Sequence, residues 1–287
     1  MKLLNLTAAL FLGGVLQAQN PLPAIHPQPQ EVTLSTNRLK APYGFTLSGM
    51  QHPDEDAMRL IRQTLSITDN SEALPLKITS LEDRTPELKR SGAYLLVITP
   101  KEIDIAISDS RGLFYAAQTL QQLAQTDGQG NTTLPLGVIK DYPDVAYRGT
   151  VEGFYGDPWS HTDRIEQLRF YGKMKMNTYI YGPKDDPYHS SPNWRKPYPE
   201  KEAAQIKDLV KEAAANKVDF VWAIHPGLDI KWTDEDRMNV LNKFGMMYDL
   251  GVRSFAVFFD DISGEGAKAD KQADLLNFLQ KEFIEKK

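Results

Sequence analysis

The 287-residue sequence predicts an α/β protein in two parts, a small α+β domain followed by the first half of a (β/α)8 TIM barrel. Three observations predict this. Short strand candidates and one helix fill residues 22–142, and the pattern changes at Asp141-Tyr-Pro-Asp144. Four strand candidates then alternate with four helix candidates. Polar, aromatic and glycine residues follow the strand candidates directly, as they do at the carboxyl ends of barrel strands.

Residues 1–19 are typical of a secretory signal peptide, because a lysine precedes a mostly apolar stretch that ends in Gln17-Ala18-Gln19. The apolar stretch is too short for a comfortable membrane span, although it could also form an ordinary N-terminal helix. No other segment could cross a membrane. We therefore expect a secreted or periplasmic protein.

The α+β domain is expected over residues 22–142, after a proline-rich lead-in that cannot be helical. Its clearest strands are Tyr94–Ile98 and Ile103–Ile107, the second of which alternates apolar and polar residues. Arg111-Gly112 then opens a helix over Leu113–Ala124 with apolar residues at helical spacing.

The partial barrel is expected over residues 146–287. The predicted strands are Tyr147–Glu152, Met176–Tyr181, Val218–Ile224 and Ser254–Phe259, and the predicted helices are 161–175, 199–216, 233–250 and 267–285. Thr233 is a candidate helix cap, because three acidic residues follow it in the first turn. A doubly wound sheet is the alternative, but the chain lacks a Gly-x-Gly-x-x-Gly phosphate turn.

Composition excludes several classes of site. The chain has no cysteine, which excludes disulfides and thiolate metal ligands. Its net charge of −5 argues against a nucleic-acid partner, which needs a basic face. No cofactor is expected.

Asp260 and Asp261 form the most informative motif, because two adjacent carboxylates follow the apolar run Ser254–Phe259. Such a run predicts a strand buried on both faces. Burying two like charges together separates their pKa values, which is what an acid/base pair needs. The alternative is that the loop has reached water and both carboxylates are solvated or cap the next helix.

Two other segments are candidates for ligand binding. Gly153 and Tyr155 lie in a loop with two glycines and three aromatic residues, where the backbone can approach a ligand and rings can pack on a sugar. The alternative is a rigid turn over the barrel mouth. Lys184 follows the second strand and could donate to hydroxyls, unless it is only solvated. Tyr179, Tyr181, Tyr188 and Trp194 add aromatic groups, some of which belong to the core.

His225 offers a weak metal hypothesis. One histidine with two aspartates on separate strands lacks the spacing of a metal site, so no metal is expected. A metal-dependent barrel hydrolase is kept as the less favoured alternative.

Several long motifs occur together and in order: Tyr147–Gly156, Pro158–His161, Tyr171–Tyr188 and Phe255–Asp261. This set resembles glycoside hydrolase family 84, the β-N-acetylglucosaminidases, and the resemblance runs from about residue 22 to the end. Arg111–Leu120 resembles the small α+β domain that precedes the barrel in this family and in family 20 hexosaminidases.

The resemblance implies a retaining mechanism in which the 2-acetamido group of the substrate is the nucleophile and forms an oxazoline. Asp260 would orient and polarise the acetamido N–H. Asp261 would protonate the leaving oxygen and then deprotonate water. The Gly153 backbone and Lys184 would contact sugar hydroxyls, and Tyr155 would line the pocket. The partner would be an N-acetylglucosamine-containing glycan or glycoprotein.

The chain departs from the family pattern in its length. Members continue through four more β/α units that carry further sugar-binding residues, so we expect a truncated chain that is a poor enzyme alone. A non-catalytic remnant or glycan-binding fragment is the first alternative. The substrate stays open between an O-GlcNAc protein, a hyaluronan fragment and another hexosaminide.

Overall fold

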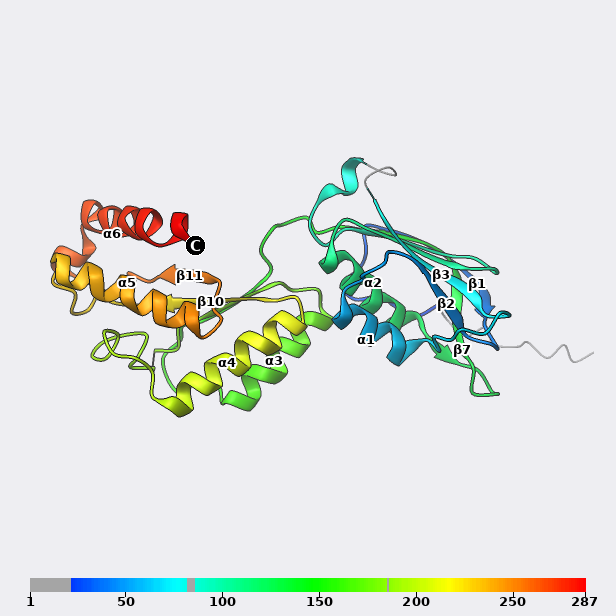
Figure 1. Cartoon of the computed structure of the whole chain (residues 1–287), viewed down its shortest axis with the longest axis horizontal. Coiled ribbons are helices and arrows are strands. Elements are labelled where there is room, and N and C mark those ends of the chain that lie inside the picture. The colour runs from blue at the N-terminus through cyan, green and yellow to red at the C-terminus, as the bar shows by residue number, and fades with distance from the viewer. Residues whose placement is uncertain (1–21, 82–85, 185) are drawn as a thin grey trace, which may run out of the picture.

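The computed structural model describes residues 22–287 apart from 82–85 and 185, so the predicted signal peptide lies outside the described residues. The described chain forms two sheets with helices around each, which lie side by side in Figure 1. Within the described ranges, no helix is both long and apolar enough to pass through a bilayer. The fold is a mixed α/β fold, as the sequence predicts.

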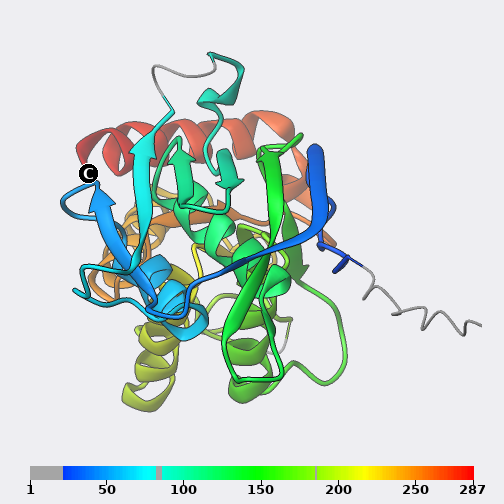
Figure 2. The same ribbon diagram turned by 90° about the vertical axis from the view of Figure 1, so that its right-hand side faces the viewer.

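The first sheet has the strand order β1-β7-β4-β5-β3-β2, with the short β6 paired to β7. Its strands are β1 (Glu31–Lys40), β2 (Phe45–Gly49), β3 (Leu74–Ser80), β4 (Tyr94–Ile98), β5 (Ile103–Ile107), β6 (Gln125–Thr126) and β7 (Thr132–Asp141). The two strands predicted here, β4 and β5, are confirmed with the same bounds. Figure 2 shows this sheet from the side that faces away from the second part.

Two helices, α1 (Glu55–Thr64) and α2 (Ser110–Leu123), cover the other face of this sheet. Helix α2 begins three residues before its predicted start, because the Asp109 carboxylate caps it by accepting the Gly112 N–H at 2.9 Å. Its residues are buried without interruption from Gly112 to Leu120. A helix buried all round lies between two layers, and here they are the sheet and the second part of the chain.

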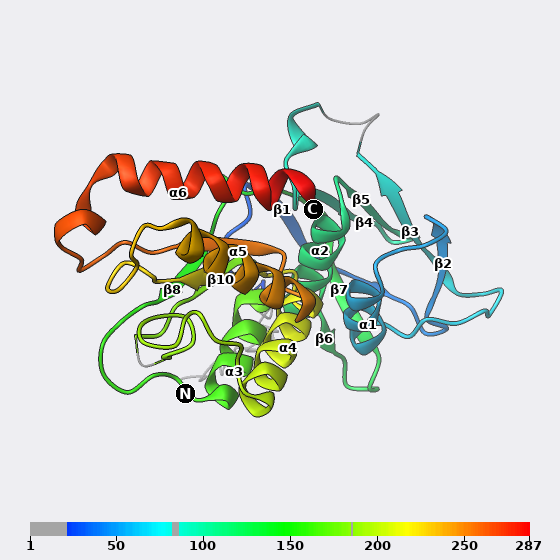
Figure 3. The same cartoon turned by 60° about the vertical axis from the view of Figure 1, so that its left-hand side comes forward.

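The second sheet is parallel, in the order β8-β9-β10-β11. Its strands are β8 (Gly149–Glu152), β9 (Thr178–Tyr181), β10 (Asp219–Ile224) and β11 (Ser254–Val257). They alternate with the helices α3 (His161–Lys173), α4 (Glu200–Ala215), α5 (Asp234–Asp249) and α6 (Ala269–Glu282), and the short 3-10 turns are Pro86–Lys89, Gly264–Ala267 and Ile284–Lys286. All four predicted units are confirmed. Thr233 caps α5 as predicted. Helices α3 and α4 run side by side (Figure 3).

The prediction for Ser254–Phe259 is wrong in two respects. The strand β11 ends at Val257, and all four of its residues are half-buried instead of being covered on both faces. It is the edge strand of an open four-stranded sheet, and no closed barrel is formed by the described residues. The apolar run therefore belongs to an edge strand, which has only one neighbouring strand. The unpaired backbone groups of such strands pair readily with other chains.

The helices α3 and α4 end in the same way, with a lysine in the left-handed conformation at the first position beyond the cap. Lys175 has φ 55° and Lys217 has φ 59°, while the corresponding residue after α5 is Gly251 at φ 103°. In each case the next residue donates back into the last turn, for example Val218 N–H to Ala213 O at 2.9 Å. Glycine is the usual residue here, because a Cβ atom costs energy in this conformation.

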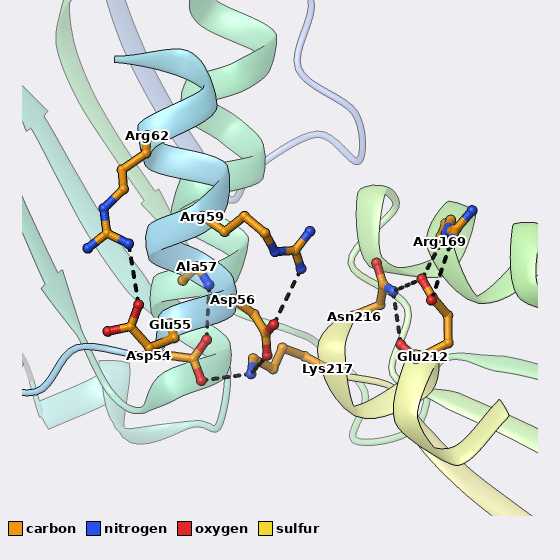
Figure 4. A network of polar contacts seen from close by, with 10 residues as sticks. All are labelled: Asp54, Glu55, Asp56, Ala57, Arg59, Arg62, Arg169, Glu212, Asn216 and Lys217. Carbon is orange, nitrogen blue, oxygen red and sulfur yellow. Dashed lines mark hydrogen bonds and ion pairs between the residues drawn. The ribbon is translucent and has the colours of Figure 1, made fainter. Parts of the chain in front are cut away.

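Both lysines bind acidic residues of the first part. Lys217 Nζ donates to Asp54 Oδ2 at 2.7 Å and to Asp56 Oδ2 at 3.0 Å, across the gap between α4 and the start of α1 (Figure 4). Lys175 Nζ donates to Asp141 Oδ2 at 2.7 Å and to the Tyr94 hydroxyl at 2.9 Å. We infer that these contacts offset the backbone strain and hold the two parts together.

This inference is tested by the effect of Lys217→Gly on the free energy of unfolding, measured with and without the two carboxylates that Lys217 binds. Lys217→Gly should lower the free energy of unfolding by about 1 kcal/mol, because two partly buried carboxylates lose their cation. In an Asp54→Asn/Asp56→Asn background the same change should be neutral or stabilising by about 1 kcal/mol, because only the relief of backbone strain remains. Asp54→Asn preserves the cap of α1, since asparagine also caps helices. Urea unfolding of the four proteins gives the values, and an equal loss in both backgrounds would contradict the inference.

Lys243 is fully buried in an aromatic cage below the loops of the second sheet. Its ammonium donates to the Lys196 carbonyl oxygen at 2.5 Å and lies 4.4 Å from the ring centre of Tyr198 and 5.8 Å from that of Trp222. Desolvation by burial lowers the pKa of Lys243 to about 8. The folded state therefore binds this proton more weakly than the unfolded chain does.

This predicts a particular pH dependence. Between pH 8 and about 10.4 the unfolded state holds the Lys243 proton and the folded state releases it, so stability rises with pH. Below pH 8 the folded state also holds the proton, so the full free-energy cost of burying the charged Lys243 ammonium is present. The free energy of unfolding of wild type, relative to that of Lys243→Met, should increase by about 2 kcal/mol from pH 7 to pH 10. Parallel pH profiles for the two proteins would show that Lys243 does not titrate in this range.

Candidate active site at the carboxyl ends of the second sheet

The register of the second sheet brings its strand ends to one edge. Glu152 pairs with Tyr181, Tyr181 pairs with Trp222, and Ile224 pairs with Val257. Each strand is followed directly by a segment that carries a predicted site residue or its neighbour. The structure consequently places Gly153, Tyr155, Lys184, Asp260 and Asp261 around one site, although they span more than a hundred residues of sequence.

Asp260 is held by two side chains, those of Lys184 and His225. The Lys184 ammonium donates to Asp260 Oδ2, and the Lys184 side chain is only 12% exposed. His225 Nε2 donates to the Asp260 carbonyl oxygen at 2.8 Å and lies 3.3 Å from Oδ1. Partial burial works to raise the pKa of the Asp260 carboxyl, but the hydrogen bond and charge of Lys184 outweigh it, and the pKa lies below its ordinary value. Asp260 is therefore a carboxylate that accepts hydrogen bonds at neutral pH.

Asp261 has different surroundings from its neighbour. Its backbone is in the left-handed region at φ 54°. The Tyr155 hydroxyl donates to Asp261 Oδ2 at 2.7 Å, and the Lys184 ammonium lies 5.3 Å from the centre of the Tyr155 ring. The hydrogen bond to Asp261 is the main cause of a raised Tyr155 pKa. The two carboxylates thus differ in partner, one bound to an ammonium and the other to a phenol.

Of the two interpretations of the aspartate pair, burial is wrong, and the alternative of a loop that has reached water is confirmed. The Asp260 side chain is 51% exposed and Asp261 is exposed as well, because the chain has left the edge strand two residues earlier. Their asymmetry therefore comes from unlike hydrogen-bond partners and not from a shared low dielectric.

Glycines shape the wall beside these residues. A Cβ atom built on Gly182 would lie 2.4 Å from Phe258 Cε2, so no other residue fits there without moving the ring. At Gly153 the nearest atom, Val151 Cγ1, would be 3.4 Å away, which is ordinary contact. Packing therefore requires a glycine at position 182, whereas a Cβ atom at position 153 would make only ordinary contacts with its neighbours.

Sequence reasoning missed the buried charge cluster behind Gly153. Glu152 is fully buried, and Arg164 of α3 donates to it from Nε at 2.9 Å and from Nη2 at 2.7 Å. The Tyr179 hydroxyl and the Trp159 backbone N–H, at 3.3 Å, donate to the same carboxylate. The available signal was a glutamate as the last residue of a predicted strand, since a carboxylate that is buried there needs a partner.

The predicted aromatic wall is largely core. Tyr179, Tyr181 and Trp194 are buried, and only Tyr188 is half-buried. Asp186 accepts hydrogen bonds from the Tyr181 and Tyr198 hydroxyls, each at 2.8 Å. These contacts fix the loop that carries Lys184.

The metal hypothesis for His225 finds no cluster. In the part of the chain that the structure describes, no group of three or more histidine, aspartate or glutamate side chains could hold a metal ion. The Nε2 atom of His225, moreover, already donates to Asp260.

The family model for beta-N-acetylglucosaminidase matches residues 148–287, and that for the second domain of glycosyl hydrolase family 20 matches residues 22–142. The solved structure of CpGH84B superposes on 92% of this chain with a TM-score of 0.83 and 36% sequence identity. The chain belongs to glycoside hydrolase family 84.

Other family 84 relatives agree with this assignment. The structure of CpGH84D superposes on 92% of the chain with a TM-score of 0.79 and 27% identity. Protein O-GlcNAcase of Rattus norvegicus is 42% identical over 125 residues, or 43% of this chain. The chain spans 48% of the length of CpGH84B and 14% of the rat protein.

Proposed function

We propose that this site removes β-linked N-acetylglucosamine by substrate-assisted catalysis, and that the four β/α units form the first half of a (β/α)8 barrel. The observation that carries the proposal is the unequal binding of two adjacent carboxylates, Asp260 by Lys184 and Asp261 by Tyr155. Family membership and the sequential parallel order of β8 to β11 support it. The site holds no covalent nucleophile of its own in this proposal.

In the first step the acetamido carbonyl oxygen attacks the anomeric carbon as the glycosidic bond breaks, which gives an oxazolinium ion whose N–H stays hydrogen-bonded to Asp260. Asp260 accepts the acetamido N–H and so increases the electron density on the carbonyl oxygen. Asp261 gives its proton to the departing oxygen. In the second step Asp261 takes a proton from water, whose oxygen attacks the anomeric carbon and reopens the acetamido group with retained configuration.

The surroundings of each carboxylate suit its proposed role. The lowered pKa of Asp260 keeps it ionised and able to accept a hydrogen bond. Asp261 lies on the exposed side, where water and the leaving group have access. Lys184 uses one ammonium hydrogen for Asp260 and has others for sugar hydroxyls, and the backbone of Gly153, close to Phe258, would make a further contact. Tyr155 lines the site above Asp261.

The proposed substrate class is an N-acetylglucosamine-containing glycan or glycoprotein. Glycan binding without hydrolysis is a second candidate. It is favoured by the exposure of both aspartates, since a general acid works best where water is excluded.

We also propose that residues 1–19 direct export, from their sequence pattern alone. The exported protein should then begin near residue 20, as read by N-terminal sequencing. Recovery in the cytoplasm with the N-terminus intact would contradict this.

Substitution of the two aspartates should reduce activity in different ways in the natural polypeptide that contains this chain. Asp261→Asn should lose most turnover of substrates with poor leaving groups, and much less with activated aryl glycosides, because these hardly need an acid. Asp260→Asn should depress both, because oxazoline formation suffers. The measurement is kcat/KM for a series of aryl N-acetyl-β-glucosaminides of differing leaving-group pKa. Equal losses across the series for Asp261→Asn would overturn the role given to it.

A further inference from the structure

We propose that Glu152 is a positioning residue that fixes the segment Gly153–Trp159 so that Tyr155 stays against Asp261. The inference rests on the proposed function only for what the site binds, because the position of Tyr155 can be measured without a substrate. Glu152 touches none of the site residues through its side chain. It acts through the loop that it closes.

The contacts of Glu152 come from both ends of that loop and from behind it. Its backbone begins the loop, and its carboxylate accepts the Trp159 N–H at 3.3 Å where the loop ends. Arg164 supplies two further donors from the first turns of α3, and Tyr179 supplies one from β9. The carboxylate is thus held by an N–H of the loop, a helix and a neighbouring strand.

Because Glu152 and Arg164 are buried, the geometry of their contacts is tightly constrained. Glu152 is fully buried and the Arg164 side chain is 12% exposed, so neither charge can be stabilised by water when the contact is broken. A buried ion pair is tolerated only when its geometry is good and its remaining lone pairs are satisfied. Small displacements of the loop end therefore carry a high energetic cost.

The loop transmits this constraint to the site. Phe154 packs edge-on against Trp159 with ring centres 5.5 Å apart, which closes the loop internally. Tyr155, at the exposed side, then reaches Asp261 with its hydroxyl and lies under the Lys184 ammonium. Because Tyr155 is 71% exposed, little packing of its own holds it there.

A second buried pair in the chain provides a matched control. Asp236 is 4% exposed and accepts Arg195 Nε and Nη2, each at 2.7 Å, together with the Lys231 backbone N–H at 2.7 Å. Like Glu152, it therefore accepts two donors from one arginine and one backbone N–H, although it lies in the first turn of α5 and Glu152 at the end of β8. It makes no contact with the loop Gly153–Trp159.

The experiment compares Glu152→Gln with Asp236→Asn in the 287-residue chain. Both variants should lose similar stability, because each disrupts a bidentate arginine pair. The readout is the pKa of Tyr155, followed by NMR with ring-labelled tyrosine and assigned with Tyr155→Phe. In wild type and in Asp236→Asn this pKa should be raised, because the hydroxyl donates to Asp261. In Glu152→Gln it should fall toward that of a free tyrosine.

An unchanged Tyr155 pKa in folded Glu152→Gln would overturn the proposal, and so would an equal fall in Asp236→Asn. If Glu152→Gln does not fold, Tyr179→Phe removes a single donor and should give a smaller fall in the same direction. Titration with N-acetylglucosamine then separates the two proposals. Weakening of binding by about tenfold in Glu152→Gln alone is expected. Absence of binding to wild type would count against the proposed function, while the pKa would still decide the role of Glu152.

Discussion

The parallel register of β8 to β11 is the constraint on which the candidate site depends. Because Glu152, Tyr181 and Trp222 lie in one row, the residues that follow the strands leave the sheet at one edge. Lys184 can then meet Asp260, 76 residues later in the sequence. The opposite ends of the same strands follow the helix turns that contain Lys175 and Lys217, which bind the first part of the chain. One sheet thus separates the site from the contacts that hold the two parts together.

Charged side chains have different surroundings behind the site and within it. Behind the site, Glu152 and Arg164 are buried and fully paired, which fixes a loop. At the site, Asp260 and Asp261 are exposed, and their unlike partners make them chemically unequal. This combination lets the framework be rigid while the carboxylates remain accessible to a ligand.

Much of the architecture could be predicted because the spacing of apolar residues indicates which positions of a helix or strand are buried. All four β/α units and the Thr233 cap were predictable for that reason. The strands β1, β2, β3 and β7 were not, since long-range pairing in a sheet leaves little local signal. The position of Ser254–Val257 at a sheet edge was predictable from the small number of β/α units, but its apolar sequence alone indicated a strand covered on both faces. The role of Glu152 depends on Arg164 and Tyr179, which only the fold brings near.

The central claim is that the 2-acetamido group of the substrate is the nucleophile and that Asp260 assists it. Its most direct test is the rate at which the natural polypeptide containing this chain hydrolyses one aryl glycoside whose N-acetyl group carries none, one, two or three fluorines. Fluorine withdraws electrons from the carbonyl oxygen, so log kcat/KM should fall steadily along the series. Rates independent of fluorination would contradict the account, because the bond to the anomeric carbon would then be made by another group.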